Sequence, residues 1–163
     1  MRLSENLKLE ECIKSNTASR LGIDNSPTEE HTKNLKLIAE KIFQPIREHF
    51  GVPIYISSGY RCKELNEAIG GAYKIVDGKK VQSSQHCHGQ ALDIDQDNRN
   101  SKVSNKDIFD YIMMNLEFDQ LIYEFGDAMN PAWVHVSYSE EKNRNRVLQA
   151  YKDNGKTRYK VYG

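Results

Sequence analysis

The chain has 163 residues, 38% of them hydrophobic and 28% charged, which is typical of one water-soluble globular domain. Its 23 basic and 23 acidic residues cancel to a net charge of zero. This balance argues against nucleic acids and anionic membranes as partners, because proteins that bind them normally carry a basic excess. A domain of this length buries roughly 70% of the surface that its unfolded chain exposes, so it should not need a metal to fold. Any metal ion would therefore serve chemistry, and a small or neutral substrate fits the charge balance.

The cysteines and the N-terminus indicate the cellular compartment in which we expect the protein. Cys12, Cys62 and Cys87 cannot all pair and show no C-x-x-C spacing, so we expect reduced thiols and no cysteine-only zinc site. The N-terminus has no apolar stretch of signal-peptide length, and no segment approaches the roughly 20 apolar residues of a membrane span. We expect a protein that is cytoplasmic on synthesis and does not insert into a membrane.

The first third of the chain predicts a long helix. Ser26 suits an N-cap and Pro27 a first helical position, and apolar residues then recur at three- and four-residue steps. We predict a helix from about Thr28 to His49, with a kink at Pro45. Two histidines of this helix are expected to have no chemical role, His31 and His49.

Short strands and two helices are predicted in the rest of the chain. The strands are expected at 54–56, 91–95, 120–123 and 133–136, the helices at 63–69 and 105–115, and hairpin turns at Asp77–Gly78 and Asn154–Gly155. Because helices come first and strands mixed with helices follow, an α+β fold is favoured over a doubly wound sheet. No linker or repeat is visible, so we expect one domain with three parts: a helical part at about 1–50, a sheet at about 51–138 and a C-terminal hairpin at about 146–162.

The segment SSQHCHGQALDIDQD, residues 83–97, holds the densest group of metal-ligand residue types. Two histidines and one carboxylate can hold a catalytic zinc ion and leave a fourth position open for water. Asp93 and His135 lie among apolar residues of predicted strands, where an unpaired carboxylate would be costly and a cation would remove that cost. Non-haem iron uses a similar ligand set, but the long helix and the wide step from His86 to Asp93 do not fit that class.

These residues resemble a known family. The pattern Ser-x-His-x-x-Gly-x-Ala-x-Asp, from Ser84 to Asp93, is that of the zinc D-alanyl-D-alanine carboxypeptidases, which are related to lysostaphin and to the Hedgehog signalling domain. Residues 58–71, 15–27 and 118–138 also look like parts of that family, in the same order. The resemblance covers about residues 7–138 and leaves the hairpin after Arg146 unexplained. It implies a small central antiparallel sheet that carries the zinc site, flanked by N-terminal helices.

The resemblance also implies the ligands of one Zn²⁺ ion. They would be His86, Asp93 and His135, with His88 and Asp95 outside the ligand set, although His88 could line the site.

Residues around the ion are implied in the same way. Arg61 would face the substrate and stabilise the oxyanion that forms during attack on a carbonyl group. Three further residues are expected to bind substrate, namely Ser84, Tyr60 and Trp133.

The reaction also needs a general base, usually a carboxylate with a raised pKa. Many relatives place this acid three residues before the last histidine, but that position here is Ala132. The nearest acid on the preceding strand is Glu124, in a Tyr-Glu sequence that resembles the Tyr-Tyr-Glu of the Hedgehog domain. We expect Glu124 to be the base, with Asp127 as the alternative.

The implied function is zinc-dependent hydrolysis of a peptide bond that involves a D-amino acid in peptidoglycan. The enzyme would be a D-Ala-D-Ala carboxypeptidase or an L-Ala-D-Glu-type endopeptidase, for example a phage or prophage endolysin that acts on the cell wall once released. The expected partner is the stem peptide, and the expected state is a monomer. The alternative is a non-catalytic zinc-binding domain of Hedgehog-like fold, which the missing acid before His135 would favour.

Overall fold

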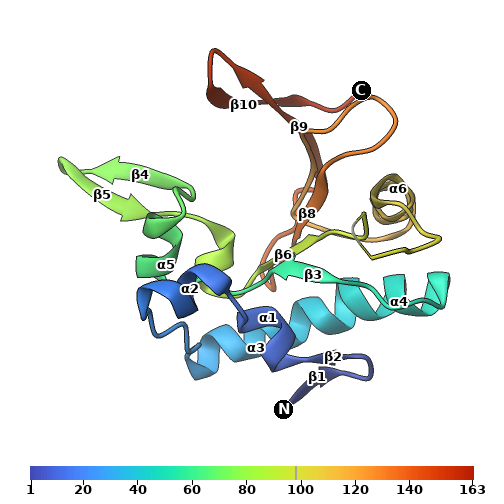
Figure 1. Cartoon of the computed structure of the whole chain (residues 1–163), viewed down its shortest axis with the longest axis horizontal. Coiled ribbons are helices and arrows are strands. Elements are labelled where there is room, and N and C mark those ends of the chain that lie inside the picture. The colour runs from blue at the N-terminus through green and yellow to red at the C-terminus, as the bar shows by residue number, and fades with distance from the viewer. Residues whose placement is uncertain (98) are drawn as a thin grey trace.

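The computed structural model describes residues 1–97 and 99–163, and it combines helices with a mixed sheet (Figure 1). The helices are α1 (Leu9–Ile13), α2 (Asn16–Leu21), α3 (Glu29–Ile38), α4 (Gln44–Phe50), α5 (Lys63–Ala68) and α6 (Asn105–Asn115). The strands are β1 (Arg2–Ser4), β2 (Leu7–Lys8), β3 (Ile56–Ser58), β4 (Tyr73–Val76), β5 (Lys79–Gln82), β6 (Ala91–Ile94), β7 (Gln120–Glu124), β8 (Trp133–Ser137), β9 (Arg146–Asp153) and β10 (Lys156–Val161). This arrangement is compatible with the predicted α+β class.

The predicted long helix is present, but its N-cap lies two residues later than expected and the helix is interrupted. The N-cap is Thr28, whose side chain accepts a hydrogen bond from the backbone N–H of His31. Ser26 does not cap the helix, because its own N–H and hydroxyl donate to Oδ1 of Asp24. A π-helical turn at Ala39–Phe43 separates α3 from α4, and Pro45 follows it in the first turn of α4. This π-helical turn explains how the helix continues past Pro45, a residue that has no backbone N–H.

Six strands form the central sheet in the order β10-β9-β7-β8-β6-β3. The strands within 51–138 pair antiparallel, as expected, but β9 of the C-terminal hairpin adds to this sheet by pairing with β7 in parallel. The physical reason is the path of the chain after β8: Asn145 donates to the carbonyl of Phe118 and Arg146 to that of Asp119, so β9 starts beside the start of β7. The predicted C-terminal hairpin therefore extends the central sheet.

Most of the buried apolar residues lie in one large cluster that joins the sheet to the helices. The helix stripe and the inward side chains of the central strands are almost fully buried in it: Leu35, Ile38, Ile42, Phe43, Ile46, Leu92, Ile94, Leu121, Tyr123, Val134 and Val136. Since side chains alternate along a strand, the residues between them point away from this cluster. Asp93, Ile122 and His135 therefore share the opposite face of the sheet, as their direct pairing confirms.

Other predicted elements are also present. The helix at α6 and the two hairpin turns match their predicted positions, and Asp77 and Asn154 each precede a glycine with positive φ. The first of the predicted strands corresponds to β3, which lies at Ile56–Ser58 instead of 54–56. All three cysteines are free, as expected. Within the described residues, no helix is long and apolar enough to cross a membrane.

Candidate metal centre

Two histidines and one aspartate meet on the face of the sheet opposite the large apolar cluster. Asp93 on β6 and His135 on β8 are direct cross-strand partners, and His86 comes from the 3₁₀ turn Gln85–His88 that leads into β6. Oδ1 of Asp93 lies 3.0 Å from Nδ1 of His135 and 3.3 Å from Nε2 of His86. The two ring nitrogens are 3.3 Å apart. The three atoms thus form a compact triangle from three different elements.

The triangle fits a tetrahedral metal ion. Ligand atoms at about 2.0–2.1 Å from such an ion lie roughly 3.3 Å from one another. The observed separations of 3.0–3.3 Å agree with this value. Two imidazole nitrogens and one carboxylate oxygen are also a donor set that zinc accepts, with one position left for water. These residues could therefore hold a metal ion, as their grouping indicates.

A backbone carbonyl orients the first ligand. Nδ1 of His86 lies 2.6 Å from the carbonyl oxygen of Gly59, and a carbonyl can only accept, so Nδ1 carries the proton. The lone pair of the neutral ring is then on Nε2, the atom that faces Asp93. Burial lowers the pKa of His86, which favours this neutral form. The hydrogen bond thus prepares His86 as a ligand.

The carboxylate of Asp93 is buried but remains ionised. Burial alone would raise its pKa, but the neighbouring imidazole groups of His86 and His135 more than offset this effect, and the pKa lies well below its usual range. A cation bound at the triangle would compensate the buried negative charge further.

Glu124 ends β7 two strands away from Asp93 and belongs to the same cavity. The residue is only 7% exposed. Burial raises its pKa to about 7; the imidazole of His135 opposes this effect and the negative charge of Asp93 adds to it. A carboxyl group of this kind can accept a proton near neutral pH.

Arg61 brings an uncompensated positive charge to the cavity. It is held by two long hydrogen bonds, both 3.4 Å, to the hydroxyl groups of Ser58 and Ser84. Its Nε atom is buried and has no hydrogen-bond partner in the described part of the chain. Burial lowers its pKa, although Asp93 opposes this effect. A buried donor without a partner is costly and would be satisfied by a substrate oxygen.

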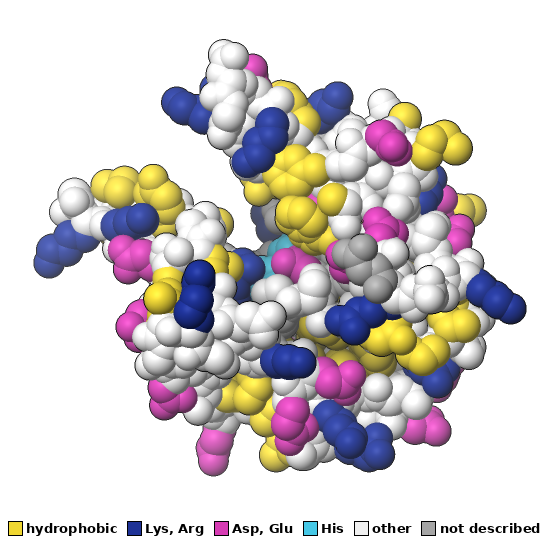
Figure 2. Space-filling view, viewed as in Figure 1, with side chains coloured by type: hydrophobic (Ala, Val, Ile, Leu, Met, Phe, Trp, Pro, Cys, Tyr) yellow, Lys and Arg dark blue, Asp and Glu magenta, His cyan; other side chains and the backbone are white. Residues whose placement is uncertain are grey.

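The cluster, Glu124 and Arg61 line one cavity of about 880 Å³. Figure 2 shows the hollow, with histidine and acidic side chains at its base.

Among known families, Peptidase M15 matches residues 5–137. The chain belongs to the Peptidase M15 family. No curated protein matches it. The match covers the three ligand candidates, Arg61 and Glu124, and it stops at the end of β8. The protein is thus a metallopeptidase.

Two of the three residues expected to bind substrate line this cavity of the M15 peptidase. Ser84 and Trp133 line it. Ser84 also caps the turn that holds His86, by accepting a hydrogen bond from the His86 backbone N–H. Tyr60 does not lie there: it is 5% exposed, packs in the apolar core and stacks on His31 at 4.7 Å. It points away because adjacent residues of an extended segment face opposite sides, and Arg61 takes the cavity side.

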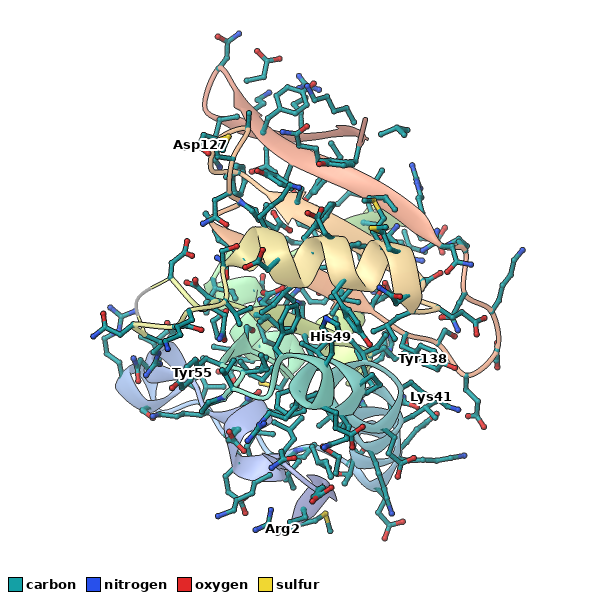
Figure 3. All side chains as sticks on the ribbon, turned by 90° about the vertical axis from the view of Figure 1, so that its right-hand side faces the viewer. Arg2, Lys41, His49, Tyr55, Asp127 and Tyr138 are labelled. Atoms are coloured by element: carbon teal, nitrogen blue, oxygen red, sulfur yellow. The ribbon has the colours of Figure 1, made fainter. Side chains whose placement is uncertain are left out.

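The remaining candidates lie outside the cavity lining of the M15 peptidase. Asp127 is exposed on the loop between β7 and β8 (Figure 3), where its Oδ1 accepts hydrogen bonds from the N–H groups of Met129 and Asn130. Asp95 accepts from Nδ2 of Asn105, and His88 is exposed, with its carbonyl bound to Asn34. The structure therefore favours Glu124 over Asp127 as the acid near the cluster.

The two helix histidines have structural environments. His49 is exposed near the end of α4 and stacks on Tyr111 at 4.1 Å (Figure 3). His31 is half-buried: its ring packs on Tyr60 and its Nδ1 accepts a hydrogen bond from the N–H of Thr28.

Sequence reasoning missed several residues of the cavity wall. They come from the two hairpins and the start of β9: Tyr73, Arg144, Arg146, Leu148, Thr157 and Tyr159. The turn signals at both hairpins were visible, but nothing in the local sequence indicates which face a hairpin turns toward the site.

Proposed function

We propose that this M15 peptidase hydrolyses a peptide bond that involves a D-amino acid in peptidoglycan stem peptides, with one Zn²⁺ ion held by His86, Asp93 and His135. The observation that supports it most is the buried carboxyl of Glu124, with a pKa of about 7, in the same cavity as the ligand triangle and Arg61. A zinc ion in such a site activates water and polarises the carbonyl group that is attacked.

The side chains have complementary roles in this proposal. Glu124 accepts a proton from the attacking water and returns it to the amino group that leaves, because its pKa lies close to neutral pH. Arg61 donates hydrogen bonds to the carbonyl oxygen as negative charge develops there. Ser84 holds the Arg61 guanidinium in place, and Trp133 offers an apolar wall for the peptide.

The substrate of this reaction lies outside the cytoplasm. We infer that the protein acts on the cell wall after release, in the manner of an endolysin.

The test is digestion of purified peptidoglycan, followed by mass spectrometry of the fragments. The zinc-loaded protein should release peptides, and a new amino terminus on D-glutamate or the loss of one terminal D-alanine identifies the bond. Glu124→Gln should bind zinc but release nothing. Asp127→Asn is the matched control and should digest as the unchanged protein does.

Two outcomes would contradict the proposal. Full activity of Glu124→Gln would exclude this residue as the base. Absence of any cleavage, with zinc bound, would favour the non-catalytic zinc-binding domain.

A further inference from the structure

The C-terminal hairpin, β9–β10, lies outside the segment that the family match covers, yet it forms one wall of the cavity. It is anchored firmly at its base. Arg144 makes two hydrogen bonds to the carboxylate of Asp119, at 2.8 and 2.9 Å, and the same carboxylate accepts from Nε2 of Gln85, which precedes His86. The hairpin is thus tied to the turn that carries a metal-ligand candidate.

The register of the sheet aligns Tyr159 with the catalytic face. Trp133 pairs with Glu124, Glu124 with Ala150, and Ala150 with Tyr159. Directly paired residues share one face of a sheet. The residue between Glu124 and Tyr159 in this row is Ala150, whose side chain is small.

Tyr159 is well placed to contact a ligand. Its side chain is 55% exposed and lines the cavity. Burial raises the pKa of its phenol, with smaller contributions from the charges of Glu124 and Asp93, as expected for a hydroxyl near the site. Tyr73, on the hairpin β4–β5, lines the cavity as well. In Figures 1 and 2 the two hairpins project on either side of the hollow.

The size of the cavity suits a ligand longer than a dipeptide. Its volume of about 880 Å³ is near the upper end of the roughly 300–1,000 Å³ range of small-molecule pockets. A cavity of this volume has room for more of a peptide than the two residues at the bond that is cut.

The hairpin also carries a strong positive charge in a chain with none overall. Residues 144–163 contain six basic side chains and one acidic one, a net charge of +5, so residues 1–143 carry –5. Arg146 lines the cavity, and it has no acidic partner among the described residues. Lys156, Arg158 and Lys160 face away from the cavity, on the same side as Tyr151, and Arg144 is bound to Asp119. Arg146 is therefore the positive charge of this wall that can attract a free carboxylate.

We propose that the hairpin β9–β10 is a substrate-binding arm, in which Tyr159 and Arg146 bind the part of an acidic peptide that extends beyond the bond cut at the His86–Asp93–His135 cluster. This inference rests on the proposed function and adds a specificity for substrate length and charge. Tyr159 supplies a flat apolar surface and a hydroxyl, and Arg146 pairs with a carboxylate such as that of D-glutamate.

Binding can be measured without turnover in the zinc-loaded Glu124→Gln protein. Trp133 is the only tryptophan and lines the cavity, so its fluorescence reports ligand binding. The probes are a stem pentapeptide with free D-glutamate and the blocked dipeptide D-Ala-D-Ala. Tyr159→Ala is compared with Tyr151→Ala, a matched control whose side chain lies on the opposite face of the same hairpin.

Tyr159→Ala should weaken pentapeptide binding about tenfold and leave the dipeptide unchanged, while Tyr151→Ala should alter neither. Equal pentapeptide affinity with and without Tyr159, or an equal loss for both peptides, would overturn the binding arm and leave the proposed function standing. If neither peptide binds the parent protein, the proposed function and the binding arm both fall.

Charge recognition is tested separately. Arg146→Gln should weaken binding of the pentapeptide with free D-glutamate about tenfold, but not of the same peptide with that carboxylate converted to an amide. An equal effect on both peptides would overturn the role of Arg146.

Discussion

Nδ1 of His86 donates a hydrogen bond to the carbonyl oxygen of Gly59 at 2.6 Å. This contact leaves Nε2 free to bind a metal ion, and it joins the segment before β6 to the end of β3. Gly59 can pack against the backbone of Cys12 because it has no side chain: a Cβ atom there would overlap the carbonyl oxygen of Cys12. The metal centre thus depends on a glycine that provides no ligand.

Gly59→Ala should therefore weaken zinc binding by about 10- to 100-fold, the usual cost when the partner of a ligand is displaced. The measurement is competition for zinc against a chelating dye. Gly51→Ala, at a left-handed position with open space around it, should lower stability without altering zinc affinity. Unchanged zinc affinity in Gly59→Ala would mean that the Gly59 carbonyl does not orient His86.

Arg61→Lys should lower kcat/KM about 100-fold while the zinc content stays at its normal level. The ammonium group keeps the charge but cannot donate from several nitrogens at once, so it stabilises the oxyanion less well. Kinetics on a stem peptide and metal analysis of the same samples check this. A normal rate in Arg61→Lys would remove Arg61 from the mechanism.

Glu124 should make the stability of the metal-free protein depend on pH. Because burial raises its pKa from 4.5 to about 7, the folded state binds the proton more tightly than the unfolded state. The contribution of protonated Glu124 to the free energy of unfolding is fully present below pH 4.5 and is lost as the pH rises through 7. Glu124→Gln should thus match the unchanged protein near pH 4 and exceed its free energy of unfolding at pH 8 by up to about 3 kcal/mol.

Urea unfolding of the chelator-treated proteins at both pH values measures this difference. Glu117→Gln, at an exposed glutamate, is the control and should show none. If the free energies of unfolding of Glu124→Gln and the unchanged protein differed by the same amount at both pH values, burial would not raise the pKa of the Glu124 carboxyl.

Local patterns were enough to predict much of this fold and site. The apolar stripe of α3 and α4, the α6 helix and both hairpin turns follow from short-range chemistry, and the match to Peptidase M15 covers the segments that suggested the family. The prediction that Asp93 and His135 lie on strands among apolar residues is also confirmed.

The rest depends on contacts between distant parts of the chain. The parallel pairing of β9 with β7 is set by the loop that crosses the start of β7, which local sequence does not encode. Tyr60 and Arg61 are neighbours, and only packing against His31 decides that the tyrosine turns into the core. Ser26 was expected to cap the long helix, but its N–H and hydroxyl bind the carboxylate of nearby Asp24 instead.

The most direct test of the account is a zinc titration of chelator-treated protein while hydrolysis of a stem peptide is followed. The rate should be near zero at the start, rise in proportion to added zinc and level off at about one ion per chain. Asp93→Ala should show no such rise, because it removes a ligand. Hydrolysis that persists in the metal-free protein, or full recovery by Asp93→Ala, would contradict a metal centre at His86, Asp93 and His135.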